Sequence, residues 1–368
     1  MEVKKIGIVG CGNISGIYLT NIGGRFTNIK VAGICDLIRE KAETQAKNFG
    51  VTKIYLDMYE LFDDPEVDIV LNITRPNDHY GVSKAALLAG KHVYSEKPLA
   101  TNVDDAKELV QLAKDRGLYL GGAPDTFLGA GIQTARRLID DGEIGEIIGA
   151  NAHMLARGPE SWHPDPEFFY KRGGGPMLDM GPYYTTALVN LLGAAEAVTA
   201  FGRITFPKRT IGSEPHRGEV IDVEVDTFTS GAIRFASGAI ASLTVSFDTY
   251  AERGSFIEIY GANGSILVPD PNCFGGDVML RRENGPYERV DLIEGFTANS
   301  RALGLSEMAD AIGDGRLHRA NYMQQLHVLE IMTAFEKSNR SGAQVIIDAP
   351  FERQPALVPS EIKSVSYT

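Results

Sequence analysis

The stretch KKIGIVGCGNIS, residues 4–15, decides the fold. Its first half is a short apolar run of the kind that forms a buried strand. Gly10 permits a tight turn after that run, and Gly12 leaves room for a pyrophosphate to reach backbone N–H groups at a helix start. The third small position is Ser15 instead of glycine, and serine still allows close packing of helix on strand.

Apolar runs and amphipathic segments alternate from this stretch to about residue 123. We expect helices over 37–50, 77–90 and 101–117, and further strands over 28–36, 67–74, 91–95 and 118–123. Near-continuous apolar strands that alternate with helices indicate a parallel sheet covered on both faces. We therefore predict an α/β fold that begins with a doubly wound, Rossmann-type dinucleotide-binding domain over residues 1–123.

Asp36 closes the second strand, 24 residues beyond Gly12. A carboxylate at this place accepts hydrogen bonds from the hydroxyls of the adenosine ribose. The simpler interpretation is that Asp36 caps the next helix. Because its charge would repel a 2′-phosphate, NAD is the expected cofactor, while Arg39 leaves NADP open as the second choice.

The rest of the chain has a different pattern, with one helix expected over about 126–145 and another over 322–342. Strand-like runs follow one another with few helices between them, over 146–155, 197–205, 223–236, 238–249, 255–261 and 264–270. Such a series indicates a largely antiparallel open sheet. We predict that residues 124–368 form an α+β domain for substrate binding and oligomerisation, with a large, mostly antiparallel open sheet.

Composition limits the classes of protein to consider. A chain of 368 residues is long enough for two domains, and its net charge of −12 argues against nucleic acid or an anionic membrane as a partner. No apolar run is long enough to span a bilayer, and the first strand begins without a signal peptide before it. The three cysteines, Cys11, Cys35 and Cys273, have no metal-site spacing, and no histidine pair has one either, so we expect no metal. A cytoplasmic location is the plain interpretation.

Four motifs together resemble one family. They are GCGNIS (10–15), ITRPNDHY (73–80), AGKHVYSEKPLA (89–100) and GGGPMLDMGPYY (173–184). The whole chain resembles the Gfo/Idh/MocA family of oxidoreductases. The resemblance implies NAD(P)-dependent hydride transfer between nicotinamide and a sugar, polyol or related cyclic alcohol. It also implies a homodimer or homotetramer formed through the open face of the second sheet.

The lysine of the E-K-P motif, Lys97, is the first catalytic candidate. By resemblance it lies at the carboxyl end of a strand, faces the nicotinamide and contacts the reacting oxygen of the substrate. A partly desolvated ammonium can polarise a carbonyl or stabilise a developing alkoxide. Pro98 stiffens the chain after it by fixing φ. The alternative is a surface lysine that pairs with Glu96.

The loop after the third strand, RPNDH, lies where ligands bind in doubly wound sheets. By resemblance it lines the cofactor, although a turn with an N-cap at Asn77 or Asp78 fits the same residues, and His79 fits a core position equally well. The predicted cofactor-binding residues are Gly10, Gly12, Asn13, Ile14, Asp36, Thr74, Pro76, Asn77, His79, Glu96 and Lys97.

A second catalytic group lies in the motif D-x-G-x-Y. Asp179 and Tyr183 are four residues apart, so they share one face if a single helix runs over 177–193. Many members of the family carry histidine at the second place, and the tyrosine version resembles glucose–fructose oxidoreductase and the dimeric dihydrodiol dehydrogenases. A phenol beside Lys97 could relay the substrate proton, and Asp179 could orient the substrate or hold Lys97. Packing at a helix start is the alternative for Tyr183.

The segment upstream mixes rings with hydrogen-bonding groups, a composition that suits a sugar pocket. A lid or a subunit contact would have the same composition. The predicted substrate-binding residues are Lys97, Arg157, Trp162, His163, Asp179 and Tyr183.

Two rival functions remain open. One is a glycoside-cleaving enzyme that keeps NAD bound and uses transient oxidation. The other is a non-catalytic dinucleotide sensor, which needs only the glycine loop and Asp36 and gives Lys97, Asp179 and Tyr183 no role.

Overall fold

The computed structural model describes residues 3–250 and 256–365, and the predicted strand 255–261 begins at Ser255, outside them. The chain divides into two compact units. Unit 1 comprises Met1–Ala130, Glu294–Leu326 and Gln354–Thr368, and unit 2 comprises Gly131–Ile293 and His327–Arg353. The two later segments of unit 1 lie in the part of the sequence assigned above to the second domain, so unit 1 is discontinuous in sequence. The boundary between residues 123 and 124 stays a prediction.

Unit 1 is built on a five-stranded sheet with the order β2-β1-β3-β4-β5. Every pair in it is parallel, as the sequence predicted. The register places Val9 opposite Cys35 and Asn72, and Asn72 opposite Ser95, so these strands end at one edge. The strands are β1 (Lys4–Val9), β2 (Ile29–Cys35), β3 (Ile69–Asn72), β4 (His92–Ser95) and β5 (Leu120–Gly122).

The helices of unit 1 follow the expected apolar spacing. Helix α5 begins after Asn102, whose side chain accepts a hydrogen bond from the Asp105 N–H, and it ends at Gly117 in the left-handed conformation. Its buried face (Val103, Ala106, Leu109, Val110 and Ala113) recurs with helical period. The helices are α1 (Ser15–Gly24), α2 (Arg39–Phe49), α3 (Met58–Asp63), α4 (His79–Leu88), α5 (Val103–Arg116) and α9 (Leu303–Asp314), with 3-10 turns η1 (Pro76–Asp78), η2 (Thr126–Leu128) and η5 (Pro359–Glu361).

Unit 2 contains a nine-stranded sheet with the order β15-β14-β13-β12-β6-β11-β10-β7-β16. All neighbours are antiparallel except the parallel pair β6 and β11, which confirms a mostly antiparallel sheet. The strands are β6 (Ile147–Leu155), β7 (Ala195–Arg203), β10 (Phe228–Phe235), β11 (Ile240–Ser246), β12 (Phe256–Gly261), β13 (Gly264–Val268), β14 (Val278–Arg282), β15 (Glu288–Val290) and β16 (Val345–Ile346). A separate hairpin joins β8 (Lys208–Thr210) to β9 (Val220–Asp222).

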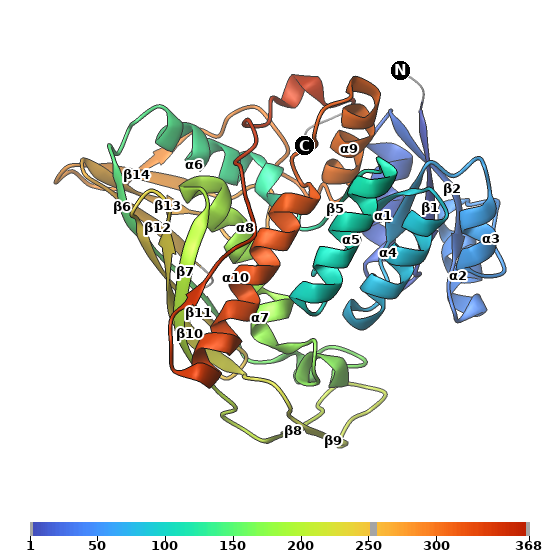
Figure 1. Ribbon diagram of the computed structural model, residues 1–368, viewed down its shortest axis with the longest axis horizontal. Coiled ribbons are helices and arrows are strands. Elements are labelled where there is room, and N and C mark those ends of the chain that lie inside the picture. The colour runs from blue at the N-terminus through green and yellow to red at the C-terminus, as the bar shows by residue number, and fades with distance from the viewer. Residues whose placement is uncertain (1–2, 251–255, 366–368) are drawn as a thin grey trace. The chain divides into compact units, whose positions relative to one another are not determined.

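Helices cover one side of this sheet, where Figure 1 shows α8 and α10. Every residue of α8 is buried, so this helix forms the centre of the unit 2 core. The opposite face carries exposed apolar side chains, among them Ile148, Phe201 and Ile240. The helices are α6 (Ala130–Asp140), α7 (Gly175–Asp179), α8 (Gly181–Leu192) and α10 (Tyr322–Ser341), with 3-10 turns η3 (Pro159–Ser161) and η4 (Glu167–Tyr170).

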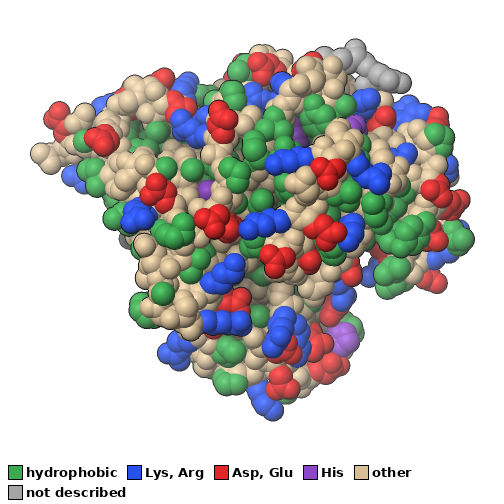
Figure 2. Space-filling view, in the orientation of Figure 1, with side chains coloured by type: hydrophobic (Ala, Val, Ile, Leu, Met, Phe, Trp, Pro, Cys, Tyr) green, Lys and Arg blue, Asp and Glu red, His purple; other side chains and the backbone are tan. Residues whose placement is uncertain are grey.

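The surface matches the acidic but mixed composition of the chain. Acidic and basic side chains are interspersed on the face drawn in Figure 2. Among the helices of residues 3–250 and 256–365, none is long and apolar enough to cross a membrane.

Candidate active site

The glycine loop joins β1 to α1 at the edge where the parallel strands end. Gly10 has φ +104°, and a Cβ there would lie 2.7 Å from the carbonyl oxygen of Ile73. Its N–H donates to the carbonyl of Cys35 at 2.9 Å, which ties the loop to the end of β2. Both the backbone angle and the close approach require glycine at this position.

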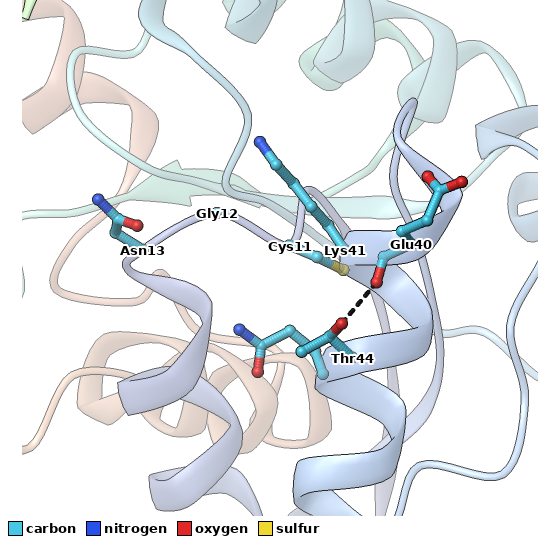
Figure 3. A pocket seen from close by; sticks show the side chains of 7 residues that line it. Cys11, Gly12, Asn13, Glu40, Lys41 and Thr44 are labelled. Atoms are coloured by element: carbon cyan, nitrogen blue, oxygen red, sulfur yellow. Dashed lines mark hydrogen bonds between the residues drawn. The ribbon is translucent and has the colours of Figure 1, made fainter. Parts of the chain in front are cut away.

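Gly12 faces open space, since a Cβ built there meets nothing within 4 Å. The loop borders a hollow of about 460 Å³ whose other side is helix α2, and Figure 3 shows the Thr44 hydroxyl bonded to the Glu40 carbonyl there. No side chain caps α1 and its first turn carries no acidic residue. A bare loop before an uncapped helix start suits an anionic group, so these residues fit a dinucleotide pyrophosphate. The hollow is lined by Cys11, Gly12, Asn13, Glu40, Lys41, Thr44 and Gln45.

Asp36 shapes this loop directly. One carboxylate oxygen accepts the Cys11 N–H at 2.7 Å and the other accepts the Ile38 N–H at 2.8 Å. Asp36 thus stabilises the turn but does not cap α2, whose N-cap is Ile38 without a side-chain hydrogen bond. Each carboxylate oxygen keeps acceptor capacity for a ribose hydroxyl. Arg39, the residue that left NADP open, forms an ion pair with Glu43 at 2.9 Å.

Asn72, which sequence reasoning missed, organises the turn after β3. Its Oδ1 accepts the Thr74 hydroxyl at 2.7 Å, and its Nδ2 donates to the His79 carbonyl and the Ser83 hydroxyl, both at 3.0 Å. Asn72 is fully buried, so these bonds satisfy an amide that would otherwise be costly to bury. The spacing N-x-T at the end of an apolar strand was the only signal in the sequence.

His79 is buried at the start of α4 and bridges two loops. Its Nδ1 lies 2.7 Å from the Pro98 carbonyl oxygen, and its Nε2 lies 3.1 Å from the Thr74 carbonyl oxygen. Burial lowers the pKa of this imidazole. His79 thus connects the loop after β3 to Pro98, the residue that follows Lys97. Pro76 and Asn77 lie in turn η1, between Thr74 and His79 in the chain.

Glu96 and Lys97 directly follow β4. The Glu96 N–H donates to the Asn72 carbonyl at 2.7 Å, and the Lys97 N–H donates to the Glu96 carboxylate at 3.0 Å. Lys97 is partly buried, and its bond to Pro98 is cis. The structure therefore places this lysine at the carboxyl end of a sheet strand, as predicted, and not on an open surface.

Asp179 and Tyr183 lie in unit 2, on either side of a helix break. Helix α7 ends at Asp179, Met180 has helical angles (φ −103°, ψ −28°), and α8 begins at Gly181. The single helix expected over 177–193 is thus two short ones, because Pro182 supplies no N–H in the first turn. Tyr183 is 7% exposed and Asp179 is partly buried. Their joint action with Lys97 stays a prediction.

The aromatic segment of unit 2 combines an exposed ring with fixed neighbours. Trp162 is 67% exposed, and its ring meets that of His163 edge-on at 5.5 Å. The His163 Nδ1 accepts the Asp165 N–H at 3.0 Å. Arg157 lies over the rings of Phe206 and Tyr250, at 5.1 and 5.0 Å.

A buried ion network anchors this segment, and it was not predicted from the sequence. The Arg209 guanidinium donates to Glu160 at 2.8 Å and also to Asp248, while the Tyr170 hydroxyl donates to Glu160. The Arg209 side chain is 2% exposed. Because the two carboxylates lie 49 and 39 residues from Arg209 in sequence, no local pattern connects them to it. Within the described ranges, no group of three histidine, cysteine or acidic side chains is arranged to hold a metal ion.

Comparison with known proteins identifies the family. A family model described as an oxidoreductase family with an NAD-binding Rossmann fold matches residues 4–121, and the model of the GFO/IDH/MocA C-terminal domain matches residues 132–267. The chain belongs to the Gfo/Idh/MocA family. It is accordingly an oxidoreductase with an NAD-binding Rossmann domain, and the predicted family, fold and cofactor are confirmed.

Named relatives share most of the chain. It is 31% identical over 291 residues to 1,5-anhydro-D-fructose reductase of Ensifer adhaerens. The matched residues cover 77% of this chain and 79% of the reductase. The chain is 26% identical over 282 residues to myo-inositol 2-dehydrogenase of Thermotoga maritima, with coverage of 76% and 79%. The apo form of levoglucosan dehydrogenase superposes with a TM-score of 0.83 at 21% identity, covering 95% and 100% of the two chains, and so shares the fold.

Proposed function

We propose that this oxidoreductase acts on the CH–OH group, or the corresponding carbonyl, of a sugar, polyol or related cyclic alcohol. The observation that carries the proposal is Lys97, partly buried at the end of β4, on the same edge of the sheet as the glycine loop. An ammonium there can polarise a substrate carbonyl or stabilise an alkoxide. The names of the relatives, a reductase of a sugar derivative and an inositol dehydrogenase, support this substrate class.

The cofactor would be held by the glycine loop and the turn after β3. Gly12 and the start of α1 suit the pyrophosphate, Asp36 would accept the ribose hydroxyls, and Asn13 and Ile14 would line the same side. Pro76 and Asn77 would line the adenosine and nicotinamide sides of the cofactor, with Thr74 beneath, and Glu96 and Lys97 would contact it after β4. His79 is 1% exposed and has both ring nitrogens beside carbonyl oxygens, so it would act by holding this turn. When bound, NAD supplies the acceptor or donor of the hydride.

Lys97 and Tyr183 would share the proton of the substrate oxygen. The phenol of Tyr183 would pass the proton, with the lysine cation favouring its ionised form. Asp179 would orient the substrate or hold Lys97. Arg157, Trp162 and His163 would bind the sugar through ring contacts and hydrogen bonds, because they combine an exposed ring with fixed polar groups.

The open face of the nine-stranded sheet is the surface we propose for a homodimer or homotetramer. Phe201 is 77% exposed there and Ile148 is 64% exposed, and apolar side chains on a sheet face are stabilised by cover. Replacing Phe201 with Glu would then lower the molar mass measured by light scattering. A cytoplasmic location remains our expectation, because the three cysteines are odd in number and have no C-x-x-C spacing.

The deciding experiment mixes the purified protein with sugars, inositols and glycosides, with NAD or NADP, and follows NADH or NADPH by absorbance. Net NADH formation with a sugar or polyol supports the proposal and names the substrate. Release of sugar from a glycoside without net NADH supports the redox-assisted glycosidase. Tight NAD binding with no reaction across the panel supports the dinucleotide sensor.

A further inference from the structure

Four acidic or phenolic side chains of unit 1 interact electrostatically around the residue that precedes Lys97. They are Tyr18 from α1, Tyr94 from β4, Glu96 after β4, and Asp125 before turn η2, and we call them the Glu96 cluster. Tyr18, Tyr94 and Asp125 are each at most 1% exposed. None of the roles assigned above uses Tyr18, Tyr94 or Asp125, so their burial around Glu96 needs a separate explanation.

The Glu96 carboxylate is held at both of its oxygens. The Tyr18 hydroxyl donates to Oε1 at 2.7 Å, and the Lys97 N–H donates to Oε2 at 3.0 Å. The Glu96 N–H is itself fixed on the Asn72 carbonyl at 2.7 Å. These two hydrogen bonds fix the orientation of the Glu96 carboxylate, and the carboxylate in turn fixes the backbone N–H of Lys97.

A phenylalanine at position 18 would fill the core as well as the ring of Tyr18 does, so packing does not account for the hydroxyl. The aromatic ring fills the core between α1 and the sheet, and the added oxygen is buried where only a hydrogen bond makes it tolerable. That bond goes to the residue before Lys97. The chain therefore buries a phenol against a partly buried carboxylate directly before the lysine.

Asp125 gives the cluster a second carboxyl group with a different environment. Its Oδ2 accepts the Gly304 N–H at 3.1 Å. The charged or titratable groups that face it are Tyr18, Tyr94, Glu96 and Arg301. Burial raises the pKa of Asp125 to about 6, and the charge of Glu96 acts in the same direction, while the Gly304 N–H and Arg301 oppose them.

We propose that Tyr18 is a positioning residue for Lys97, acting through the Glu96 carboxylate. The inference rests on the proposed catalytic role of Lys97.

The kinetic test compares Tyr18→Phe with a matched control, Tyr55→Phe. Tyr55 also donates its hydroxyl to a carboxylate at 2.7 Å in unit 1, but the acceptor is Asp64, far from Lys97 in sequence and outside the proposed site. We expect Tyr18→Phe to lower kcat about ten-fold through a displaced lysine, with NADH affinity within about two-fold of wild type. Tyr55→Phe should leave both unchanged, and an equal loss in the two variants would overturn the positioning role.

A second readout does not depend on turnover. Reductive ¹³C-methylation labels the lysines, and the Lys97 resonance is assigned by its absence in Lys97→Arg. We expect Tyr18→Phe to shift or broaden that resonance.

The outcomes separate the two levels of the argument. If Tyr18→Phe leaves both kcat and the Lys97 resonance as in wild type, the positioning role is overturned. If Lys97→Ala remains active while Tyr18→Phe moves the resonance, the proposed function is wrong and the positioning contact stands. Thermal unfolding of each variant shows that the fold is retained before either conclusion is drawn.

Discussion

The Glu96 cluster and the network around Arg209 both bury charged groups, but they satisfy them with different partners. In the network, one guanidinium lies between the carboxylates of Glu160 and Asp248. In the cluster, Glu96 accepts from a phenol and a backbone N–H. One region places a cation between its carboxylates, whereas the other holds a carboxylate with neutral donors.

The difference separates anchoring from chemistry. The Arg209 guanidinium donates to a carboxylate on each side, Glu160 and Asp248, and so fixes the aromatic segment at its place in unit 2. A carboxylate held by neutral donors keeps its negative charge, which remains able to act on a neighbouring ammonium. We therefore expect changes in the network to alter stability and changes near Lys97 to alter turnover.

Breaking the network should have the largest effect on stability. Arg209→Met leaves two buried carboxylates without their cation, so we expect the free energy of unfolding of unit 2 to fall by about 3–5 kcal/mol. Arg217→Met is the control, since Arg217 forms an exposed pair with Glu214 and should change stability by about 0.5 kcal/mol or less. Urea unfolding of both variants measures the difference, and equal effects would contradict the distinction.

Acid should lower the free energy of unfolding of unit 1 through the buried histidine His318. Unlike Arg209, this side chain does not lie between two carboxylates of the residues that the structure describes. Burial lowers the pKa of His318 from 6.5 to about 4. Because the unfolded chain binds the proton more readily, the neutral form stabilises the fold fully above pH 6.5. This stability is lost as the pH falls to about 4, at a cost of about 3 kcal/mol.

The variant His318→Gln should flatten this acid limb of the stability curve. His216→Gln is the control, because His216 is exposed and its pKa is raised by Glu219. Denaturant unfolding at a series of pH values gives both curves. An acid limb that is unchanged in His318→Gln would assign the loss to other groups.

The two glycines of the loop offer a comparison within the cofactor site itself. Gly10→Ala is strained by its positive φ and by the Ile73 carbonyl, so we expect a loss of about 1–3 kcal/mol in stability. Gly12→Ala meets nothing, and its stability should stay within about 0.5 kcal/mol of wild type. NADH affinity, followed by fluorescence, should nevertheless fall about ten-fold in Gly12→Ala, since the added methyl blocks the pyrophosphate. Unchanged affinity would place the pyrophosphate elsewhere.

The smallest effect is expected at the exposed ring of the aromatic segment. Trp162→Ala removes a side chain that is 67% exposed, so the melting temperature should hardly change. If the ring contacts the sugar, KM should rise several-fold with kcat nearly constant. Tyr59→Ala, an exposed aromatic of unit 1, should change neither constant. A wild-type KM in Trp162→Ala would remove this residue from the substrate site.

Local patterns in the sequence predicted most of unit 1 correctly. The apolar strands, the helix stops at Gly50 and Gly117 and the glycine loop depend on neighbouring residues, and the structure has them where expected. The helix expected over 177–193 breaks at Met180 because Pro182 has no N–H to donate, and the spacing of residues alone did not distinguish one helix from two. Strands β14 and β15 were missed because Val278–Arg282 and Glu288–Val290 are short and rich in charge.

The contacts that position the site residues could not be predicted from the sequence. Tyr18 lies 78 residues from Glu96, and Glu160 lies 49 residues from Arg209, so only the folded chain connects them. Asn72 and His79 were visible as residues, but their bonds depend on where the loops after β3 and β4 meet. The motif that carries Lys97 was recognisable, whereas the groups that hold it were not.

The most direct test of the central claim measures hydride transfer and NADH binding in Lys97→Ala beside Lys84→Ala. Lys84 is a partly exposed lysine that pairs with Glu108 outside the proposed site. With the sugar or polyol found in the panel, we predict that Lys97→Ala loses about 10³-fold in turnover and keeps NADH affinity within a few-fold, while Lys84→Ala matches wild type in both. A Lys97→Ala variant that turns over normally, or that fails to bind NADH, would contradict the account.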